Sequence, residues 1–273
     1  MNEKKAKDIM TTDVIVAKKG DTISEVANVL ISGKIGGLPV VDEDNKVVGI
    51  ISETDIIKKE NEGLPLILFG HSMGSFVSQR YIELYGKELD GVILSGTNGR
   101  PEYITKLGIL ISKVEMMIRG RKAKSKIMDK LSFGNFNRSF KPNRTNYDWL
   151  CSVDEEVDKY IESDYCGFIC TTSYYYDLIR GLWKINKKEN LELIPKDLPV
   201  LIFAGDKDPV GDFGKGIKRL YECYKELGIH DLKYKLYKNG RHEMLNESNK
   251  DEVILDILNW TNRIVKVNEK VTN

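Results

Sequence analysis

The sequence is poor in the residues that hold metals or cross-link secreted proteins. Its 273 residues include 4 cysteines and 3 histidines, with no Cys-x-x-Cys pair and no clustering of the two residue types. Reduced structural thiols are therefore predicted at Cys151, Cys166, Cys170 and Cys223, with a disulfide or a zinc site as the alternative. No metal ligands are assigned.

Long apolar runs and an excess of one charge are also absent. No run approaches the roughly 20 residues that cross a bilayer. The stretch MNEKKAKDIM is charged and lacks the apolar core of a signal peptide, so we expect a cytoplasmic protein without a transmembrane segment. A formal net charge of +1, from 42 Lys plus Arg and 41 Asp plus Glu, gives no reason to expect a nucleic-acid partner.

Residues 5–60 show the pattern of a small separate unit. The stretch 13–21 predicts a short strand, and an amphipathic helix follows with Asp21 as its N-cap. Two apolar runs joined by a polar turn predict a hairpin over 38–52. A short helix over 53–63 completes a β-α-β-β-α order.

This order resembles a single cystathionine-β-synthase-type (CBS) module over 1–62. The resemblance is carried by Asp8-Ile9-Met10, by Gly37-Leu38-Pro39-Val40-Val41-Asp42 and by the stretch from Val48 to Ile56. It implies an adenosine-nucleotide site with Ser52 and Asp55 on ribose or phosphate, and a homodimer, because such modules work in pairs. The alternative is that Ser52 and Asp55 only cap the final helix.

From Leu64 onward the pattern changes to that of an α/β fold. The run 64–69 is continuously apolar, as expected for a strand buried on both faces of a parallel sheet. A turn and a helix follow, and the helix presents Phe76, Val77, Tyr81, Leu84 and Tyr85 on one side. Further strands are predicted at 90–96, 198–205 and 232–240, the last one edge-like, before a C-terminal helix. This is the order of the second half of an α/β-hydrolase, with a helical cap inserted at about 100–195.

The turn after the first of these strands carries a nucleophile motif. Gly70-His71-Ser72-Met73-Gly74 reads Gly-x-Ser-x-Gly between an apolar strand and an amphipathic helix. Its glycines are expected to let the strand turn sharply, and the helix N-terminus adds positive potential where negative charge develops. Ser72 is therefore the predicted nucleophile, with the Met73 N–H as an oxyanion donor.

An acid and a base follow the serine in the order that this fold requires. Asp208 comes after a buried strand and His242 after the last strand, so both belong to loops at the edge where such sheets build their sites. Asp206 is the rival acid. His230 is expected at the surface, and His71 is expected to shape the pocket wall.

Residues 64–266 resemble bacterial monoacylglycerol lipases and lysophospholipases of the serine aminopeptidase type. The resemblance is carried by LPLILFGHSMGSF, DGVILSGT, RTNYDWLCSVDEEVDKYIESDYCGF, LPVLIFAGDKDPVG and YKNGRHEMLNE. It implies a cap that admits an acyl chain. An aromatic stripe, Tyr174, Tyr175, Tyr176, Leu178, Ile179 and Trp183, either lines that cap or packs its helices.

One part of the family pattern is missing. Members carry a His-Gly loop that supplies a second oxyanion donor, and no His-Gly pair precedes Ser72 here. The strand 64–69 would then be the first of its sheet and an open edge. We predict a cofactor-independent serine esterase over 63–273, weakened by this loss, that acts on acyl esters through Ser72, Asp208 and His242. The alternative is a nucleotide-binding, dimerising regulatory protein with an inactive hydrolase remnant.

Overall fold

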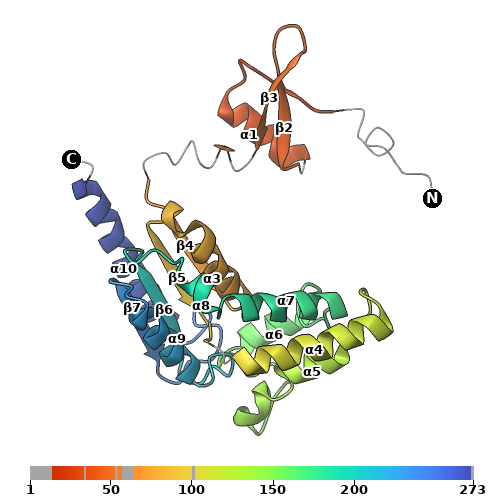
Figure 1. Ribbon diagram of the computed structural model, residues 1–273, viewed down its shortest axis with the longest axis vertical. Helices are drawn as coiled ribbons and strands as arrows, with labels where there is room; N and C mark the ends of the chain where they lie inside the picture. Colours follow the sequence, from red (N-terminus) through yellow and green to blue (C-terminus); the bar gives the residue numbers. More distant parts are fainter. Residues whose placement is uncertain (1–13, 34, 53–54, 57–63, 100–101, 272–273) are drawn as a thin grey trace. The chain divides into compact units, whose positions relative to one another are not determined.

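The computed structural model in Figure 1 describes residues 14–33, 35–52, 55–56, 64–99 and 102–271, without the side chains of 102–104 and 267–271. The chain forms two compact units, Met1–Leu64 (unit 1) and Pro65–Asn273 (unit 2). The predicted boundary at 62/63 lies outside the described residues, as do Asp8-Ile9-Met10 and most of the predicted helix over 53–63.

The described part of unit 1 contains a three-stranded sheet and an 11-residue helix. Its elements are β1 (Ala17–Lys18), α1 (Ile23–Gly33), β2 (Gly37–Val41) and β3 (Val47–Ser52). β1 pairs parallel to β2, and β2 pairs antiparallel to β3, which confirms the hairpin. Asp55 and Ile56 are helical. The described part of unit 1 therefore follows the predicted strand, helix, strand, strand, helix order.

The N-cap of α1 differs from the prediction. Thr22 and Glu25 bond reciprocally: the Thr22 N–H donates to the Glu25 carboxylate at 2.8 Å, and the Glu25 N–H donates to the Thr22 hydroxyl at 3.2 Å. The Asp21 carboxylate instead accepts the Lys18 N–H, at 2.7 Å. Asp21 thus closes the turn after β1, and Thr22 caps the helix in a capping-box arrangement.

Unit 2 is built on a parallel sheet. Its described strands are β4 (Ile67–His71), β5 (Gly91–Ser95), β6 (Val200–Gly205) and β7 (Leu232–Tyr237), in that spatial order. β5 and β6 are buried along their length, as predicted. β4 stands at one edge and β7 at the other. Within the described residues β4 is the first strand of its sheet and an open edge, as predicted, whereas the expectation that 64–69 is buried on both faces is wrong, because Leu66 and Phe69 are 50% and 40% exposed.

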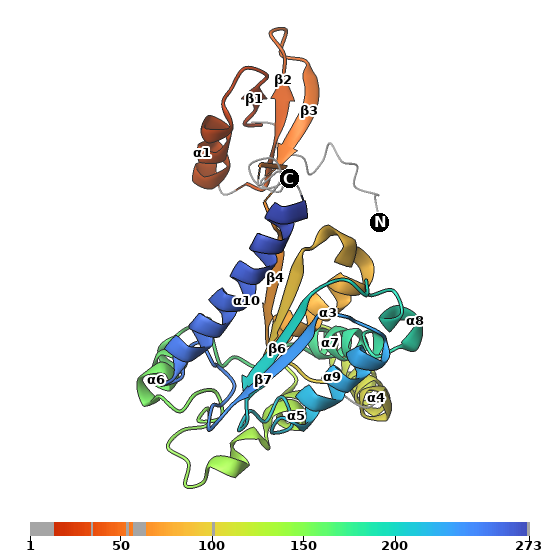
Figure 2. The ribbon, with the colours of Figure 1, turned by 90° about the vertical axis from the view of Figure 1, so that its left-hand side faces the viewer.

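Helices cover both faces of this sheet. Side chains alternate along β5 and β6, so Leu94 and Ile202 face α3 (Met73–Tyr85) and α9 (Lys215–Glu226), while Ile93 and Phe203 face the other way. The second face is covered by α10 (Lys250–Val271), which Figure 2 shows lying along the sheet. These two apolar layers hold the carboxyl ends of the strands in place.

The face that α3 buries is mostly polar. The buried residues are Ser75, Ser78, Gln79, Ile82 and Glu83. The predicted apolar stripe points away from the sheet, and Val77, Leu84 and Tyr85 are 61%, 48% and 49% exposed. α3 ends at Gly86, as predicted, and a 3₁₀ turn, η2 (Gly86–Glu88), leads to β5.

The segment between β5 and β6 forms a helical cap, as expected. Its elements are α4 (Glu102–Arg119), α5 (Lys126–Phe133), η3 (Phe136–Phe140), α6 (Asp154–Glu162), α7 (Thr172–Lys184) and α8 (Lys188–Leu191). The aromatic stripe of α7 divides between two roles. Tyr175 is buried and donates to Asp129 at 3.0 Å, whereas Tyr174 and Leu178 line an open groove beside α3.

Candidate active site

Ser72 occupies a sharp turn between β4 and α3. Its backbone is in an unusual conformation, with φ 52° and ψ −120°. The Ser72 N–H donates to the Ser95 carbonyl at 2.9 Å, and the Ser75 hydroxyl donates back to the Ser72 carbonyl at 2.6 Å. A positive φ is costly for a serine, and these bonds hold the residue there. The turn has the form of a nucleophile elbow.

Of the two motif glycines, the structure requires one. A Cβ at Gly70 would overlap the Ser78 hydroxyl and the Gly74 carbonyl, because α3 begins directly over the strand end. A Cβ at Gly74 meets nothing within 4 Å. The expectation that both glycines relieve clashes is therefore wrong for Gly74, whose surroundings are open among the described atoms.

Asp208 and His242 are brought together at the carboxyl ends of β6 and β7. The His242 Nδ1 lies 3.0 Å from the Asp208 Oδ2, and the two side chains are 3% and 0% exposed. The Val210 N–H donates to the Asp208 Oδ1 at 2.8 Å. Because a carboxylate only accepts, His242 carries its hydrogen on Nδ1 and keeps the Nε2 lone pair for a proton. The rival Asp206 accepts the Asn239 N–H instead, at 2.8 Å.

Three neighbours fix the plane of the His242 ring. The ring centroids of His71 and Trp149 lie 4.7 and 5.2 Å from that of His242. Gly96, at φ +55°, leaves room for the ring, since a Cβ there would lie 2.9 Å from the His242 Cε1. Sequence reasoning missed Trp149 and Gly96. The Ser95-Gly96-Thr97 stretch at the end of the predicted strand 90–96 was the available signal for Gly96.

His71 forms part of this wall in its neutral form. Burial, and then the neighbouring His242, lower the pKa of His71 from 6.5 to about 4, although Asp208 acts in the opposite direction. Its Nδ1 lies 3.1 Å from the Ser95 hydroxyl. A neutral imidazole places no positive charge beside the His242 ring. His230 is exposed, as predicted.

Ser72 follows His71 in the chain, and the His71 ring centroid lies 4.7 Å from that of His242. Within the described residues, no hydrogen bond joins the Ser72 hydroxyl to the His242 ring. Catalytic hydrogen bonds are often long before substrate binds, so this geometry does not exclude the pair. Met73 is the first residue of α3, and its N–H belongs to the helix N-terminal donors that have no intrahelical acceptor.

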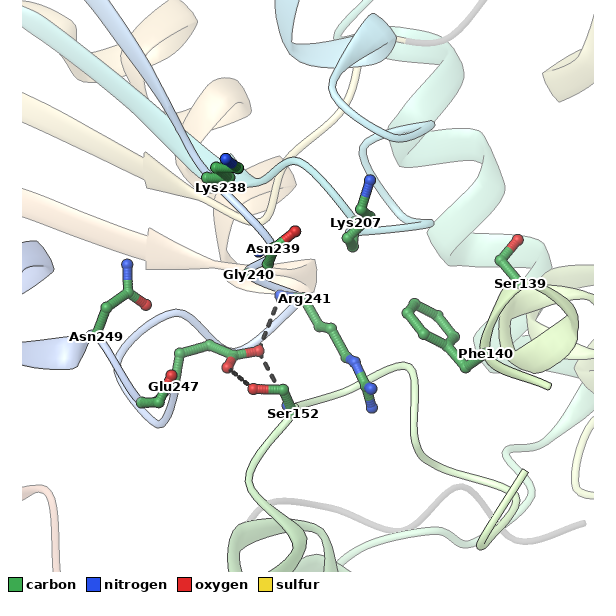
Figure 3. A pocket seen from close by; sticks show the side chains of 11 residues that line it. Ser139, Phe140, Ser152, Lys207, Lys238, Asn239, Gly240, Arg241, Glu247 and Asn249 are labelled. Carbon is green, nitrogen blue, oxygen red and sulfur yellow. Dashed lines mark hydrogen bonds between the residues drawn. The ribbon is translucent and has the colours of Figure 1, made fainter. Parts of the chain in front are cut away.

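A polar pocket of about 470 Å³ lies behind the loops that carry the acid and the base. It includes Lys207 and Arg241, the chain neighbours of Asp208 and His242. Figure 3 shows the Glu247 carboxylate between Ser152 and the backbone of Arg241. Glu247 accepts the Ser152 N–H at 3.0 Å and the Arg241 N–H at 2.9 Å, which ties the cap to the His242 loop. This link was not predicted.

In unit 1, Ser52 and Asp55 lie together. The Ser52 hydroxyl donates to the Asp55 carboxylate at 2.6 Å, and the Asp55 N–H donates back to the Ser52 hydroxyl at 3.2 Å. This is the reciprocal cap that the alternative interpretation predicts. The nucleotide role of these two residues stays a prediction.

Other site types find no support in the described part of the chain. No group of three His, Cys, Asp or Glu side chains is placed to hold a metal ion there. Cys151, Cys166, Cys170 and Cys223 are free thiols. No described helix is long and apolar enough to cross a membrane.

Comparison with known proteins identifies the family to which this architecture is similar. The family model described as serine aminopeptidase, S33, matches residues 33–249, which is most of the chain. The match begins inside unit 1 and runs through the cap to the loop after His242.

Solved structures of esterases and lipases share the fold. A thermostable carboxyl esterase from Bacillus coagulans superposes with a TM-score of 0.71 at 27% identity, over 78% of this chain and 69% of that chain. A monoglyceride lipase from Saccharomyces cerevisiae superposes with a TM-score of 0.60 at 19% identity, over 78% and 66% of the two chains. At that identity the second likeness shows the fold alone.

Curated relatives match over short segments. An uncharacterized protein of Methanocaldococcus jannaschii is 47% identical over 51 residues, and the inosine-5'-monophosphate dehydrogenase of the same organism is 45% identical over 53 residues. The matches span 18% and 11% of these relatives. Neither relative therefore transfers a whole-protein activity to this chain.

Proposed function

The chain belongs to the serine aminopeptidase S33 family of α/β-hydrolases, and we propose that it is a serine esterase whose nucleophile is Ser72. The parallel sheet, the family and the carboxyl esterase neighbour confirm the predicted ester hydrolase class. The substrates, the triad and the rate belong to the proposal.

The proposal is supported by three chain segments that end at the carboxyl edge of the same parallel sheet. The elbow holds Ser72 after β4, and the strand ends of β6 and β7 hold Asp208 and His242, with 3.0 Å between carboxylate and imidazole. In the proposed reaction His242 takes the Ser72 hydroxyl proton as the oxygen attacks the ester carbonyl. The protonated ring then gives that proton to the leaving alcohol. Water activated by the same Nε2 releases the acid.

In this proposal the Met73 N–H donates to the developing oxyanion. Removing one such donor typically costs about 2.7 to 4 kcal/mol of transition-state stabilisation. The proposed substrates are monoacylglycerol-like or lysophospholipid-like acyl esters, and no cofactor takes part in these steps.

Active-site labelling tests the nucleophile. A fluorophosphonate probe is expected to label the full chain and the Ser248→Ala variant, because Ser248 is an exposed serine outside the elbow. Ser72→Ala should lose both labelling and p-nitrophenyl butyrate hydrolysis. Equal labelling of Ser72→Ala and the wild type would contradict the assignment.

Unit 1 supports a second candidate function, an adenosine-nucleotide site in a CBS-type homodimer. Its described topology has the predicted order, and the curated matches of 51 and 53 residues are close in length to this 64-residue unit. Calorimetric titration with AMP, ATP and S-adenosylmethionine tests the ligand, and sedimentation tests the dimer. If none of the three ligands produces a heat of binding, the nucleotide proposal is wrong. The cytoplasmic location remains a prediction.

A further inference from the structure

A turn of the cap, residues 148–152, is fastened to the loop that carries His242, residues 241–247. We call these segments the cap turn and the histidine loop. The hydrogen bonds between them join residues 90 to 95 positions apart in the chain. One of these bonds runs from the Glu243 N–H to the Leu150 carbonyl, at 2.8 Å. Local propensity does not bring such distant segments together, so tertiary packing holds them as one unit.

Arg241 makes the first connection between the two segments. Its guanidinium donates to the Cys151 carbonyl at 2.9 Å and also to the Asp148 carbonyl. The guanidinium carbon lies 4.5 Å from the centre of the Phe140 ring, where the aromatic face attracts a cation. Figure 3 shows this side chain reaching from the histidine loop to a position beside that ring. A planar guanidinium can bind two carbonyls in a fixed geometry, so Arg241 fixes the course of the cap turn.

The Glu247 carboxylate makes the second connection. It accepts the N–H and the hydroxyl of Ser152 and the N–H of Arg241. Glu247 is 2% exposed, and these three donors compensate for the loss of water around a buried carboxylate. Arg241 therefore binds the carbonyls of the cap turn and Glu247 binds its last residue, so both ends of the turn are held.

The cap turn carries Trp149, whose ring contacts His242. The two ring centroids lie 5.2 Å apart with an angle of 40° between the ring planes. Trp149 is 8% exposed, and its N–H donates to the Asn137 Oδ1 at 2.9 Å. Trp149 also packs in one buried cluster with Val210, the residue whose N–H binds the Asp208 carboxylate. The cap turn therefore touches the histidine ring and the loop of the acid at the same time.

We propose that Arg241 and Glu247 are positioning residues for the base of the proposed esterase. They hold the cap turn, and the cap turn holds Trp149 against the His242 ring. This inference rests on the proposed esterase function and assigns to the cap a role in orienting the base. A hydrogen bond through Nδ1 alone leaves an imidazole free to tilt about that bond, whereas a contact with the ring face keeps Nε2 aimed in one direction. A displacement of about 1 Å in an active site can lower the rate on the order of a hundredfold.

The first test separates kcat from KM for p-nitrophenyl butyrate. Arg241→Gln removes the guanidinium, and kcat should fall about ten- to a hundredfold while KM stays within about twofold, because the base is misaligned and the ester still binds. Arg241→Lys keeps the charge and a donor and should recover part of that loss. The matched control, Lys238→Gln, removes an exposed positive charge that lines the same pocket and should keep kcat within about twofold. Equal kcat in Arg241→Gln and Lys238→Gln would contradict the proposal.

A double-mutant cycle tests whether Arg241 acts through Trp149. Trp149→Leu removes the ring contact with His242 directly and should also lower kcat. Because Arg241→Gln and Trp149→Leu interrupt the same series of contacts, the double variant should lose little more than either single variant. Full additivity of the two losses would show that Arg241 acts by another route and would overturn the proposal. Glu247→Leu, which cannot accept a hydrogen bond, replaces Arg241→Gln in the cycle if circular dichroism shows that Arg241→Gln does not fold.

A spectroscopic signature separates this proposal from the esterase proposal. The ring current of Trp149 shifts the NMR signals of the His242 ring protons, and the chain has 3 histidines, so these signals can be assigned by substitution. Arg241→Gln should move them toward their positions in Trp149→Leu, whereas Lys238→Gln should leave them in place. Signals that stay unmoved in both Arg241→Gln and Glu247→Leu would overturn the proposal. If the signals move as expected but the wild type hydrolyses no ester, the esterase proposal is wrong and the cap turn still positions the ring.

Discussion

The two sides of the proposed active site differ in burial and in how firmly their side chains are held. On the acid and base side, Asp208 and His242 are 0% and 2% exposed, and each is fixed by hydrogen bonds or flanking rings. On the nucleophile side, β4 is an edge strand and Met73 is 46% exposed. In the proposed mechanism the acid and base are therefore held in place before substrate binds, whereas the residues around the nucleophile are more exposed to solvent.

Removing the charge of the proposed acid, Asp208, should reduce activity more than any other change considered below. Asp208→Asn keeps the shape of the side chain but removes the charge that selects the His242 tautomer, so kcat should fall roughly a thousand- to ten-thousandfold. The measurement is p-nitrophenyl butyrate hydrolysis by the full chain.

The control for this change is the rival carboxylate. Asp206→Asn should keep kcat within a few-fold, because Asp206 accepts the Asn239 N–H rather than holding the histidine. If the two variants lost equal activity, the assignment of Asp208 as the acid would be wrong.

The lowered pKa of His71 predicts how the folding stability of unit 2 depends on pH. This pKa is about 4 in the folded chain and 6.5 without the fold, so between these values the unfolded state binds the extra proton. Stability should therefore fall as pH drops from 6.5 toward 4, with a contribution of up to about 3 kcal/mol from this residue.

Urea unfolding followed by tryptophan fluorescence measures this effect. The three tryptophans, Trp149, Trp183 and Trp260, all belong to unit 2, so the signal reports on the unit that contains His71. His71→Gln can still bond with Ser95 but cannot titrate, and its stability should depend less on pH in this window. If the free energy of unfolding of His71→Gln changes with pH as steeply as that of the wild type, a group other than His71 causes the pH dependence.

A substitution beside the edge strand β4 is expected to change stability the least. Leu66 precedes the edge strand and is 50% exposed, so Leu66→Lys should alter the free energy of unfolding by no more than about 0.5 kcal/mol. A lysine beside an exposed edge should nevertheless reduce self-association, as measured by light scattering.

A charged residue elsewhere provides the comparison for this edge variant. Leu107→Lys on α4 starts from a side chain that is 61% exposed and adds the same charge away from the sheet. Equal loss of self-association in both variants would attribute the effect to net charge and not to the edge.

The order of elements was predictable because it depends on local pattern. Apolar runs predicted β5 and β6, turn residues predicted the hairpin of unit 1, and the Gly-x-Ser-x-Gly motif predicted the elbow. The chain order of Ser72, Asp208 and His242 was equally visible. The choice of Asp208 over Asp206 followed from its spacing; Asp208 lies 3.0 Å from the His242 ring, and its role as the acid stays a prediction.

The predictions were wrong at positions where contacts with other residues determine burial, capping or packing. The edge position of the run 64–69 was predicted, but its apolar pattern suggested buried faces, whereas Leu66 and Phe69 are 50% and 40% exposed. Asp21 had the right residue type for a cap, yet Thr22 stood one residue closer to the helix with Glu25 in reach. Gly74 matched the motif, but the space around it is open.

The sequence by itself determined the α/β order, the elbow and the candidate acid and base, because strand periodicity and motif spacing are properties of neighbouring residues. The tertiary structure decided which face of α3 is buried, where polar Ser75, Ser78 and Gln79 lie under the elbow and the apolar stripe lines the groove. It also placed His71, Trp149 and Gly96 around His242. These contacts join segments far apart in the chain, and packing between elements, rather than local pattern, sets them.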